Sequence, residues 1–240
     1  MIKNIKISVA GIGNVGSSVV RVIIDNNKFY IKKSNIQFEI IGISGKNKNK
    51  KRNFNIDDFI WYQNPLDLIT VAKPDIFIEL IGEQKGISYK LIKTAINDKI
   101  NVVTANKALL AHHGDELFSL AEKNNVLLLY EASVAGSIPI VNTIKKSLFL
   151  NKVNKISGIL NGTTNYILSN MYNHNIDFNE ALIEAQKKGY AELNPKNDIE
   201  GLDSAHKLSI ISTLCFGIKI NFNNVVYKGI SDLHINDIKF

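Results

Sequence analysis

Asp203 and Lys207 are the residues of this 240-residue chain whose types and spacing most directly suggest chemistry. They lie four positions apart in residues 199–216, a segment predicted to be helical, so both side chains face one side. A lysine amine withdrawn from water has a lowered pKa and can pass a proton to a reacting group. The alternative is an exposed ion pair of little consequence. The spacing of Asp203 and Lys207 alone favours the exposed ion pair. The surrounding motifs are needed to favour a catalytic lysine.

A glycine-rich segment near the N-terminus has the spacing G-x-G-x-x-G. It follows an apolar run at residues 5–10, which predicts a buried parallel strand, and it opens a segment with helical spacing of valines. In that context the glycines allow a tight turn, close approach of a pyrophosphate and close packing of helix on strand. The free amides of the helix N-terminus would bind the phosphates. We expect the dinucleotide to contact Gly11, Ile12, Gly13, Asn14, Val15 and Gly16.

The end of the second predicted strand, residues 38–44, bears on which dinucleotide binds. An acid usually stands there to bind the ribose hydroxyl, but the nearby acid, Glu39, falls in mid-strand. Ser44 and Lys46 occupy the strand end instead, and a hydroxyl with a cation suits a 2′-phosphate. We therefore predict NADP, with NAD as the alternative. Lys46 as an ordinary solvated loop lysine stays open.

Predicted strands and helices alternate through the first 150 residues. Further strands are expected at residues 75–81, 101–104 and 126–130, with helices at 88–97 and 107–123. This alternation is typical of βαβ units with right-handed crossovers. We therefore predict an α/β fold in which residues 1–150 form a Rossmann-type, doubly wound parallel sheet that binds a dinucleotide.

The pattern changes beyond residue 150. Residues 152–160 suggest one strand, and helices are then expected at residues 164–172, 179–188 and 199–216. We predict that residues 151–240 form an α+β substrate-binding and dimerisation domain that is incomplete at its C-terminus.

Composition excludes several other classes of protein. The net charge is +7, but the lysines are scattered apart from residues 46–52, and the 8% aromatic content shows no stacking pattern there, so we expect no nucleic-acid partner. No apolar run approaches the roughly 18 residues of a membrane span. The chain starts directly with a predicted strand, which leaves no room for a signal peptide. The single cysteine, Cys215, fits a reducing cytoplasm.

Four longer stretches give the sequence a specific resemblance. They are Thr104-Ala105-Asn106-Lys107, the segment 130–140 (YEASVAGSIPI), the segment 158–166 (GILNGTTNY), and 189–195 (GYAELNP) with Asp198, Gly201, Asp203 and Lys207 beyond. With the glycine loop, they resemble the homoserine dehydrogenase family in its own order. Ser137 stands where the family usually has a second glycine, and Asn194 stands where an Asp is common. The family's chains also continue well past residue 240.

The resemblance implies reversible hydride transfer between L-aspartate 4-semialdehyde and L-homoserine, in threonine, methionine and isoleucine biosynthesis. It implies that Lys207 is the proton donor, that Lys107 lies beside the nicotinamide and the reacting carbonyl, and that Asp203 acts with Lys207. The parent enzyme is expected to be a homodimer. An inactive dinucleotide-binding fragment of the same family is the alternative function.

The resemblance also implies a substrate site and a cation site. Substrate-binding residues would be Glu192, Asp198, Asn161, Gly162 and Thr163. Asp198 as a helix N-cap and Thr163 as the cap of a strand-to-helix turn are the structural alternatives. A monovalent cation, predicted to be Na⁺, would bind Glu131 and the backbone carbonyls of Val134, Gly136 and Ile138. An ordinary hydrogen bond of Glu131 is the competing interpretation.

Two further groups of side chains are weaker candidates for a metal site or a catalytic nucleophile. His112 and His113 are adjacent, so on a helix they point about 100° apart and share one metal ion with difficulty. Cys215 would be the nucleophile of an acylating dehydrogenase, but it lies in an apolar helical stretch and is expected to be inert.

Overall fold

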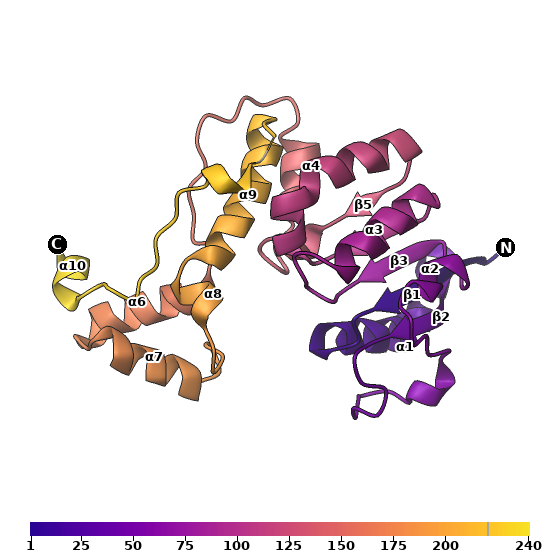
Figure 1. Cartoon of the computed structure of the whole chain (residues 1–240), viewed down its shortest axis with the longest axis horizontal. Coiled ribbons are helices and arrows are strands. Elements are labelled where there is room, and N and C mark those ends of the chain that lie inside the picture. Colours follow the sequence, from indigo (N-terminus) through magenta and orange to yellow (C-terminus); the bar gives the residue numbers. More distant parts are fainter. Residues whose placement is uncertain (220) are drawn as a thin grey trace. The chain divides into compact units, whose positions relative to one another are not determined.

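The computed structural model describes residues 1–219 and 221–240, which form two compact units, Met1–Thr143 and Ile144–Phe240 (Figure 1). Each unit has its own apolar core. In the first unit this core includes Val9 and Ile43, which are fully buried, and in the second it includes Ile167 and Met171. The two cores indicate that each unit folds around its own hydrophobic centre.

The first unit is built on a parallel sheet with the strand order β2-β1-β3-β4-β5. The chain moves outward from β1 to β2 and then returns to place β3 on the other side of β1, so the winding direction reverses between β1 and β3. Ligands of open α/β sheets bind at this reversal, beyond the carboxyl ends of the strands. The strands are β1 (Lys3–Ala10), β2 (Ile36–Ser44), β3 (Ile76–Glu79), β4 (Asn101–Thr104) and β5 (Leu128–Leu129).

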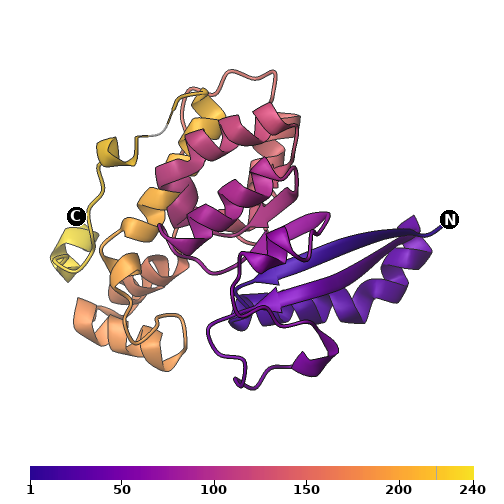
Figure 2. The ribbon, with the colours of Figure 1, turned by 45° about the vertical axis from the view of Figure 1, so that its right-hand side comes forward.

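The helices of the first unit cover both faces of the sheet (Figures 1 and 2). Helix α1 (Asn14–Ser34) packs on β1 and β2, whereas α2 (Asp67–Thr70), α3 (Ile87–Asn97) and α4 (Lys107–Asn124) pack beside one another. With helices on both sides, the last four residues of β1 are buried, which explains why they are apolar apart from Ser8, whose hydroxyl donates to the carbonyl oxygen of Leu68. The predicted doubly wound Rossmann-type sheet is confirmed.

The described residues of the second unit form helices and loops. Helices α6 and α7 pack together, and the buried side chains between them include Ile167, Met171 and Ala181. No helix within residues 1–219 and 221–240 is both long and apolar enough to span a bilayer. The helices after β5 are α5 (Ile140–Asn142), α6 (Gly162–His174), α7 (Phe178–Lys187), α8 (Lys196–Ile199), α9 (Leu202–Phe216) and α10 (Ile235–Lys239), with a π-helical turn at Thr143–Ser147.

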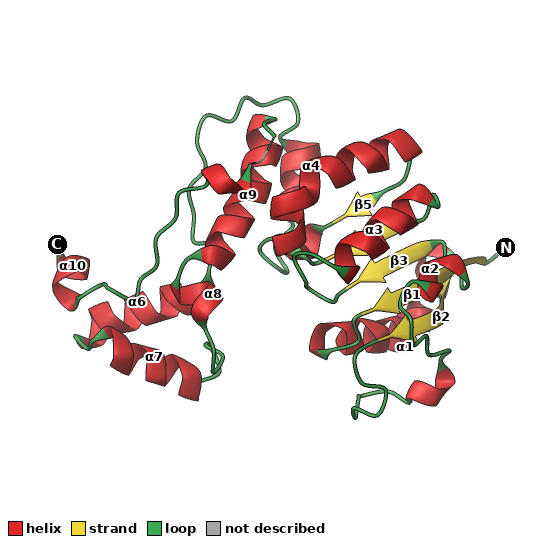
Figure 3. Ribbon diagram, viewed as in Figure 1, coloured by secondary structure: helices red, strands yellow, loops and turns green. Residues whose placement is uncertain are grey.

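The strand predicted at residues 152–160 is wrong, because this segment is a loop (Figure 3). A strand is defined by its ladder of hydrogen bonds to a neighbour, and among the described residues of this unit no other segment is a strand. Among the described residues of this unit, the segment therefore has no neighbouring strand with which to form a sheet. The α+β character expected of this unit rested on that strand.

The helix predicted at residues 199–216 is confirmed over residues 202–216 as α9, but its predicted start is wrong, because Ile199 ends a separate short helix, α8. Gly201 separates them with a φ of +84°, a conformation that favours glycine. A Cβ atom there would also lie 2.9 Å from the backbone oxygen of Lys228, and one on Gly229 would lie 2.7 Å from the backbone oxygen of Ile199. The bend between α8 and α9 is therefore packed tightly against a later stretch of the chain.

Candidate active site

The glycine loop follows β1 and leads into α1. Gly11 has a φ of +92°, and a Cβ atom on it would lie 2.4 Å from the backbone of Leu80. A Cβ on Gly16 would lie 2.2 Å from the carbonyl oxygen of Gly11, so the helix could not pack as closely with any other residue. By contrast, nothing lies within 4 Å of a Cβ on Gly13, so the backbone is open to a ligand there. The tight turn at Gly11 and the close packing at Gly16 are the roles that the sequence predicted for these two glycines.

A cavity of about 520 Å³ lies beside this loop at the carboxyl ends of β1, β2 and β3. Of the predicted cofactor residues, Gly11, Ile12, Gly13, Ser44 and Lys46 line it, together with Lys50, Arg52, Leu80, Ile81, Glu83 and Ile87. Asn14, Val15 and Gly16 form the first turn of α1, and Lys107 is not among the lining residues. Lys46 is 90% exposed, and its Nζ lies 3.6 Å from a carboxylate oxygen of Glu83. An exposed contact of this kind is weak, so Lys46 can readily turn to another anion.

Arg52 organises the lysine-rich loop beside the cavity, and no motif in the sequence marks it as a functional residue. Its guanidinium donates hydrogen bonds to the carbonyl oxygen of Ile12 and to carbonyls within the loop itself, and it lies over the ring of Trp61. Partial burial lowers the pKa of Arg52. The loop carbonyls are those of Asn47, Lys48 and Lys50, at 2.6–3.0 Å. Arginine is the residue suited to this work because its planar fork offers five donors.

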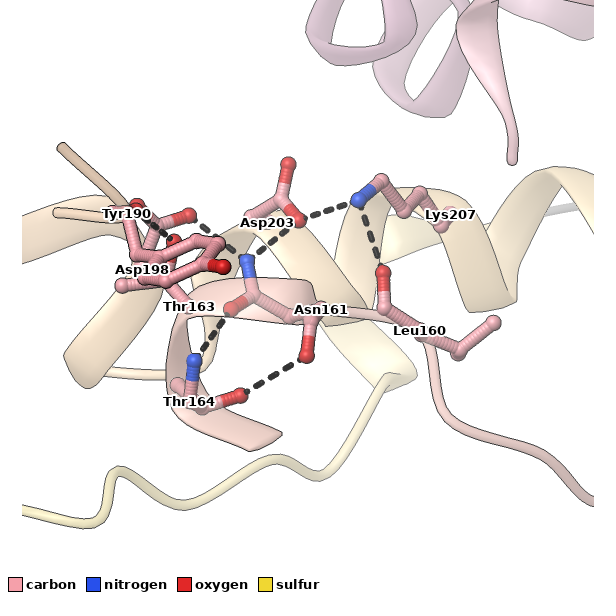
Figure 4. A network of polar contacts seen from close by, with 8 residues as sticks. All are labelled: Leu160, Asn161, Thr163, Thr164, Tyr190, Asp198, Asp203 and Lys207. Atoms are coloured by element: carbon pink, nitrogen blue, oxygen red, sulfur yellow. Dashed lines mark hydrogen bonds and ion pairs between the residues drawn. The ribbon is translucent and has the colours of Figure 1, made fainter. Parts of the chain in front are cut away.

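In the second unit, Lys207 is held by two acceptors (Figure 4). Its Nζ lies 2.5 Å from Oδ2 of Asp203 and 2.7 Å from the carbonyl oxygen of Leu160. The side chains of Lys207 and Asp203 are 18% and 8% exposed, so this pair is not the exposed ion pair considered from the sequence. The two acceptors fix the position of the ammonium group.

Asn161 connects this pair to a second carboxylate (Figure 4). Its Nδ2 donates to Oδ2 of Asp203 at 2.8 Å and to Oδ1 of Asp198 at 2.6 Å. Its Oδ1 accepts from the backbone N–H of Thr164, so Asn161 is the N-cap of α6. Because its amide serves both the helix and the carboxylates, the side chain is held in one orientation.

Two capping interpretations from the sequence are wrong. Thr163 does not cap α6, because Asn161 does, and the Thr163 hydroxyl donates to the carbonyl oxygen of Tyr190 at 2.8 Å. Asp198 does not cap the long helix, because it lies inside α8 and Gly201 is the residue before α9. The hydroxyl of Thr163 instead ties the start of α6 to the segment that contains Glu192.

Glu192 lies outside the network of Lys207, Asp203, Asn161 and Asp198. Its side chain is exposed, and its backbone carbonyl accepts a hydrogen bond from Gln186. Gly162 is the first residue of α6, directly after Asn161. The structure therefore gathers most of the predicted residues of this unit around Asn161 but leaves Glu192 to one side.

Lys107 is the first residue of α4 and belongs to the first unit. The helix is capped by Asn106, whose Oδ1 accepts from the N–H of Leu109 at 3.1 Å. The predicted position of Lys107, at the carboxyl edge of the sheet and the start of a helix, is confirmed.

Glu131, the predicted cation ligand, accepts hydrogen bonds at both carboxylate oxygens. Oε1 accepts from the N–H of Val141, and Oε2 accepts from the N–H and the side-chain amide of Asn142. The carbonyl of Ile138 accepts from the N–H of Ile140. Between these groups, Ala135 and Ser137 both have positive φ, which curls the loop that carries Val134 and Gly136.

His112, His113 and Cys215 are not among the residues that line the cavity beside the glycine loop. Among residues 1–219 and 221–240, no group of three or more His, Cys, Asp or Glu side chains is placed to hold a metal ion. The ring of His113 packs against Tyr89. Burial raises the pKa of the Cys215 thiol, which reduces the thiolate that a nucleophile needs.

The comparisons with known proteins agree with this architecture. A family model described as the NAD-binding domain of homoserine dehydrogenase matches residues 11–131, and one described as homoserine dehydrogenase matches residues 139–240. The sheet, the glycine loop and its cavity define an α/β protein with a Rossmann-type dinucleotide-binding domain. The chain belongs to the homoserine dehydrogenase family.

Individual relatives cover nearly the whole chain. The homoserine dehydrogenase of Neisseria gonorrhoeae is 38% identical over 99% of the chain, which spans 54% of that protein. The crystal structure of a homoserine dehydrogenase from Thiobacillus denitrificans matches 99% of the chain with a TM-score of 0.89 and 35% identity, over 55% of its own length. That of Thermoplasma acidophilum matches 96% with a TM-score of 0.79 and 30% identity, over 75% of its length. The chain thus spans about half the length of the curated relatives that it matches.

Proposed function

We propose that this protein catalyses the reversible NADP-dependent interconversion of L-aspartate 4-semialdehyde and L-homoserine. The observation that carries the proposal is the half-buried Lys207, held by Asp203 and the Leu160 carbonyl in a chain that matches the homoserine dehydrogenase family throughout. The whole-chain similarity to homoserine dehydrogenases favours this reaction over the alternative of an inactive dinucleotide-binding fragment.

Lys207 is the proposed proton donor. An ammonium has three N–H donors, and among the described contacts Lys207 gives one to Asp203 and one to Leu160. The remaining N–H can point to the aldehyde oxygen of the substrate and pass its proton as negative charge develops there. Asp203 holds the amine in place, and Lys107 would add positive charge near the reacting carbonyl.

The substrate's amino-acid end would be bound around Asn161. Asp198 and Asp203 offer carboxylate oxygens to the substrate ammonium, and Gly162 and Thr163 offer groups at the start of α6 for its carboxylate. A helix N-terminus favours a bound anion. Glu192 is a further proposed ligand of the ammonium, and it is exposed enough to swing toward the substrate.

The glycine cradle fits a dinucleotide, because Gly13 leaves its backbone open and the cavity adjoins it. When bound, the reduced dinucleotide supplies the hydride. Lys46, Lys50 and Arg52 line the same cavity, and this cationic lining is what supports NADP over NAD. Ser44 would add a hydroxyl to the 2′-phosphate.

A monovalent cation, Na⁺, is proposed at the loop of Glu131, Val134, Gly136 and Ile138. Glu131 is already bound by N–H donors, but among the described contacts Oε1 accepts a single hydrogen bond, from Val141, and can take a second interaction, so the residues fit a weakly charged ion. A homodimer and a cytoplasmic location remain proposals, and the single cysteine supports the latter.

The test is to mix the purified chain with L-homoserine and NADP or NAD and to follow formation of the reduced nicotinamide. Turnover with NADP that falls by about 10²–10⁴-fold in Lys207→Ala, with unchanged NADP binding, is expected. Lys187→Ala, an exchange of the same type near the end of α7, is the matched control. No turnover by the unaltered chain, or full turnover by Lys207→Ala, would contradict the proposal.

A further inference from the structure

Glu79, the last residue of β3, carries a carboxylate that is completely buried. A buried carboxylate is expensive unless it is hydrogen-bonded. Among the described residues, four neutral donors bind it. Oε1 accepts from the N–H groups of Ile81 and Gly82 at 2.9 and 3.3 Å and from the Ser88 hydroxyl at 2.9 Å, and Oε2 accepts from the Thr104 hydroxyl at 2.7 Å.

The donors to the two oxygens come from different parts of the sheet edge. Those to Oε1 belong to the loop between β3 and α3 and to the first turn of α3. The donor to Oε2 is Thr104, the last residue of the neighbouring strand β4. Glu79 therefore joins two adjacent crossover loops at the carboxyl edge of the sheet.

A second set of hydrogen bonds closes this connection into a ring. The Thr104 hydroxyl, which donates to Glu79, accepts from the N–H of Asn106 at 3.0 Å. The side-chain amide of Asn106 donates to the carbonyl oxygen of Glu83 at 2.8 Å, which returns to the loop after β3. Asn106 is also the N-cap of α4, whose first residue is Lys107.

The ring stands beside the dinucleotide cavity, whose lining includes Ile81 and Glu83. Both belong to the loop that Glu79 holds, and β3 flanks the point where the winding of the sheet reverses. We propose that Glu79 is a positioning residue that fixes one wall of the dinucleotide cavity and the start of α4, and with it Lys107. The catalytic consequence of this role rests on the proposed function, whereas the fixing of the loops does not.

Thr104 provides the cleanest test, because its exchange leaves the carboxylate in place. Thr104→Val is similar in volume but removes both the donor to Glu79 and the acceptor for Asn106. Thr104→Ser keeps the hydroxyl and should restore the ring. Ser88→Ala is the matched control, because it also removes one hydroxyl from Glu79 but leaves Oε1 with two backbone donors and the ring intact.

The three variants and the unaltered chain are compared by amide hydrogen exchange of residues 80–86 and 104–110, by NADP⁺ titration and by thermal unfolding. We expect Thr104→Val to speed exchange in both segments by at least about tenfold and to weaken NADP⁺ binding about tenfold. Thr104→Ser should stay within about twofold of the unaltered chain in both. Ser88→Ala should lower the unfolding temperature without changing exchange in residues 104–110.

Equal effects of Thr104→Val and Ser88→Ala would assign Glu79 a general stabilising role and overturn the proposal, as would unchanged exchange in residues 104–110. If Thr104→Val fails to fold, Glu79→Gln is measured in the same way, because an amide cannot accept from Thr104 and from the loop amides at once. Failure of the unaltered chain to bind NADP⁺ would count against the proposed function, while the exchange data would still decide whether Glu79 holds the loops.

Discussion

Oδ2 of Asp203 accepts hydrogen bonds from both Lys207 and Asn161, so a single carboxylate oxygen couples the proposed proton donor to the N-cap of α6. This oxygen lies in a side chain that is 8% exposed. Removal of one partner from such a pair leaves a charge with little access to water. The Lys207 ammonium therefore has Asp203 as its partly buried counter-charge, and Asp203 also helps to fix its position.

Asp203→Leu is expected to destabilise the protein by about 3 kcal/mol, because the Lys207 ammonium would lose its counter-charge. Asp203→Asn should lose less stability, since an amide oxygen still accepts from Lys207. Urea unfolding of the two variants measures the difference. The exposed pair of Arg21 and Asp25 is the control, and Asp25→Leu should change stability by about 1 kcal/mol or less. Equal losses at positions 203 and 25 would contradict the coupling.

Arg52→Met is expected to loosen the loop of residues 46–51 and to weaken NADP binding about tenfold, with a smaller effect on NAD. The reason is that the carbonyls of Ile12, Asn47 and Lys50 lose their common donor. Titration with both dinucleotides measures the ratio. Arg52→Lys, which keeps the charge but not the fork of donors, should recover only part of the affinity. A preference for NADP unchanged in Arg52→Met would show that the loop does not select the dinucleotide.

Alkylation of Cys215 is expected to be slow and harmless. Burial raises the pKa of its thiol, so at pH 7.5 the folded chain should react with iodoacetamide at least about tenfold more slowly than the chain in urea. Once modified, the protein should retain dinucleotide binding, because the cavity lies in the other unit. Rapid labelling that abolishes activity would revive an acylating dehydrogenase, whose chemistry needs a cysteine nucleophile.

His112 is expected to make the protein less stable in mild acid. Its pKa is lowered by burial first, then by the charges of His113 and Lys85, so the folded state favours the neutral imidazole. Stability from this group is complete above the ordinary histidine pKa of about 6.5 and is lost as the pH falls from there through the lowered value. His112→Gln should flatten the dependence of the unfolding temperature between pH 7 and pH 5. An unchanged slope in this variant would assign the effect to other groups.

The sequence predicted the first unit well because its signals are local. The structure has a strand at residues 101–104 and a helix that starts at Lys107, as the sequence pattern predicted. An apolar strand and a capped helix start can both be recognised from a few neighbouring residues. The bend at Gly201 was missed because apolar spacing continues through it. Its cause, the close approach of Lys228, is distant in sequence.

The candidate site was predictable only in part for the same reason. Motif resemblance indicated Lys207, Asp203 and Asn161, and the structure brings these together. No short pattern marks Glu79, whose partner Thr104 lies 25 residues later. The role of a buried carboxylate can be recognised only from the structure, which shows the groups that donate hydrogen bonds to it. The strand predicted at residues 152–160 was wrong because a strand forms only beside a neighbouring strand. The apolar pattern of a single segment does not show whether such a neighbour exists.

The bend between α8 and α9 also has a consequence for how the second unit is made on the ribosome. Gly201 packs against the backbone of Lys228, Gly229 packs against that of Ile199, and the N–H of Ile230 donates to the Ile199 carbonyl. Chains emerge N-terminus first, at about 5–20 residues per second. The helices that carry Asp198 and Asp203 therefore leave the exit tunnel before the segment that fixes the angle between them. The angle between these helices therefore has to await the arrival of residue 230.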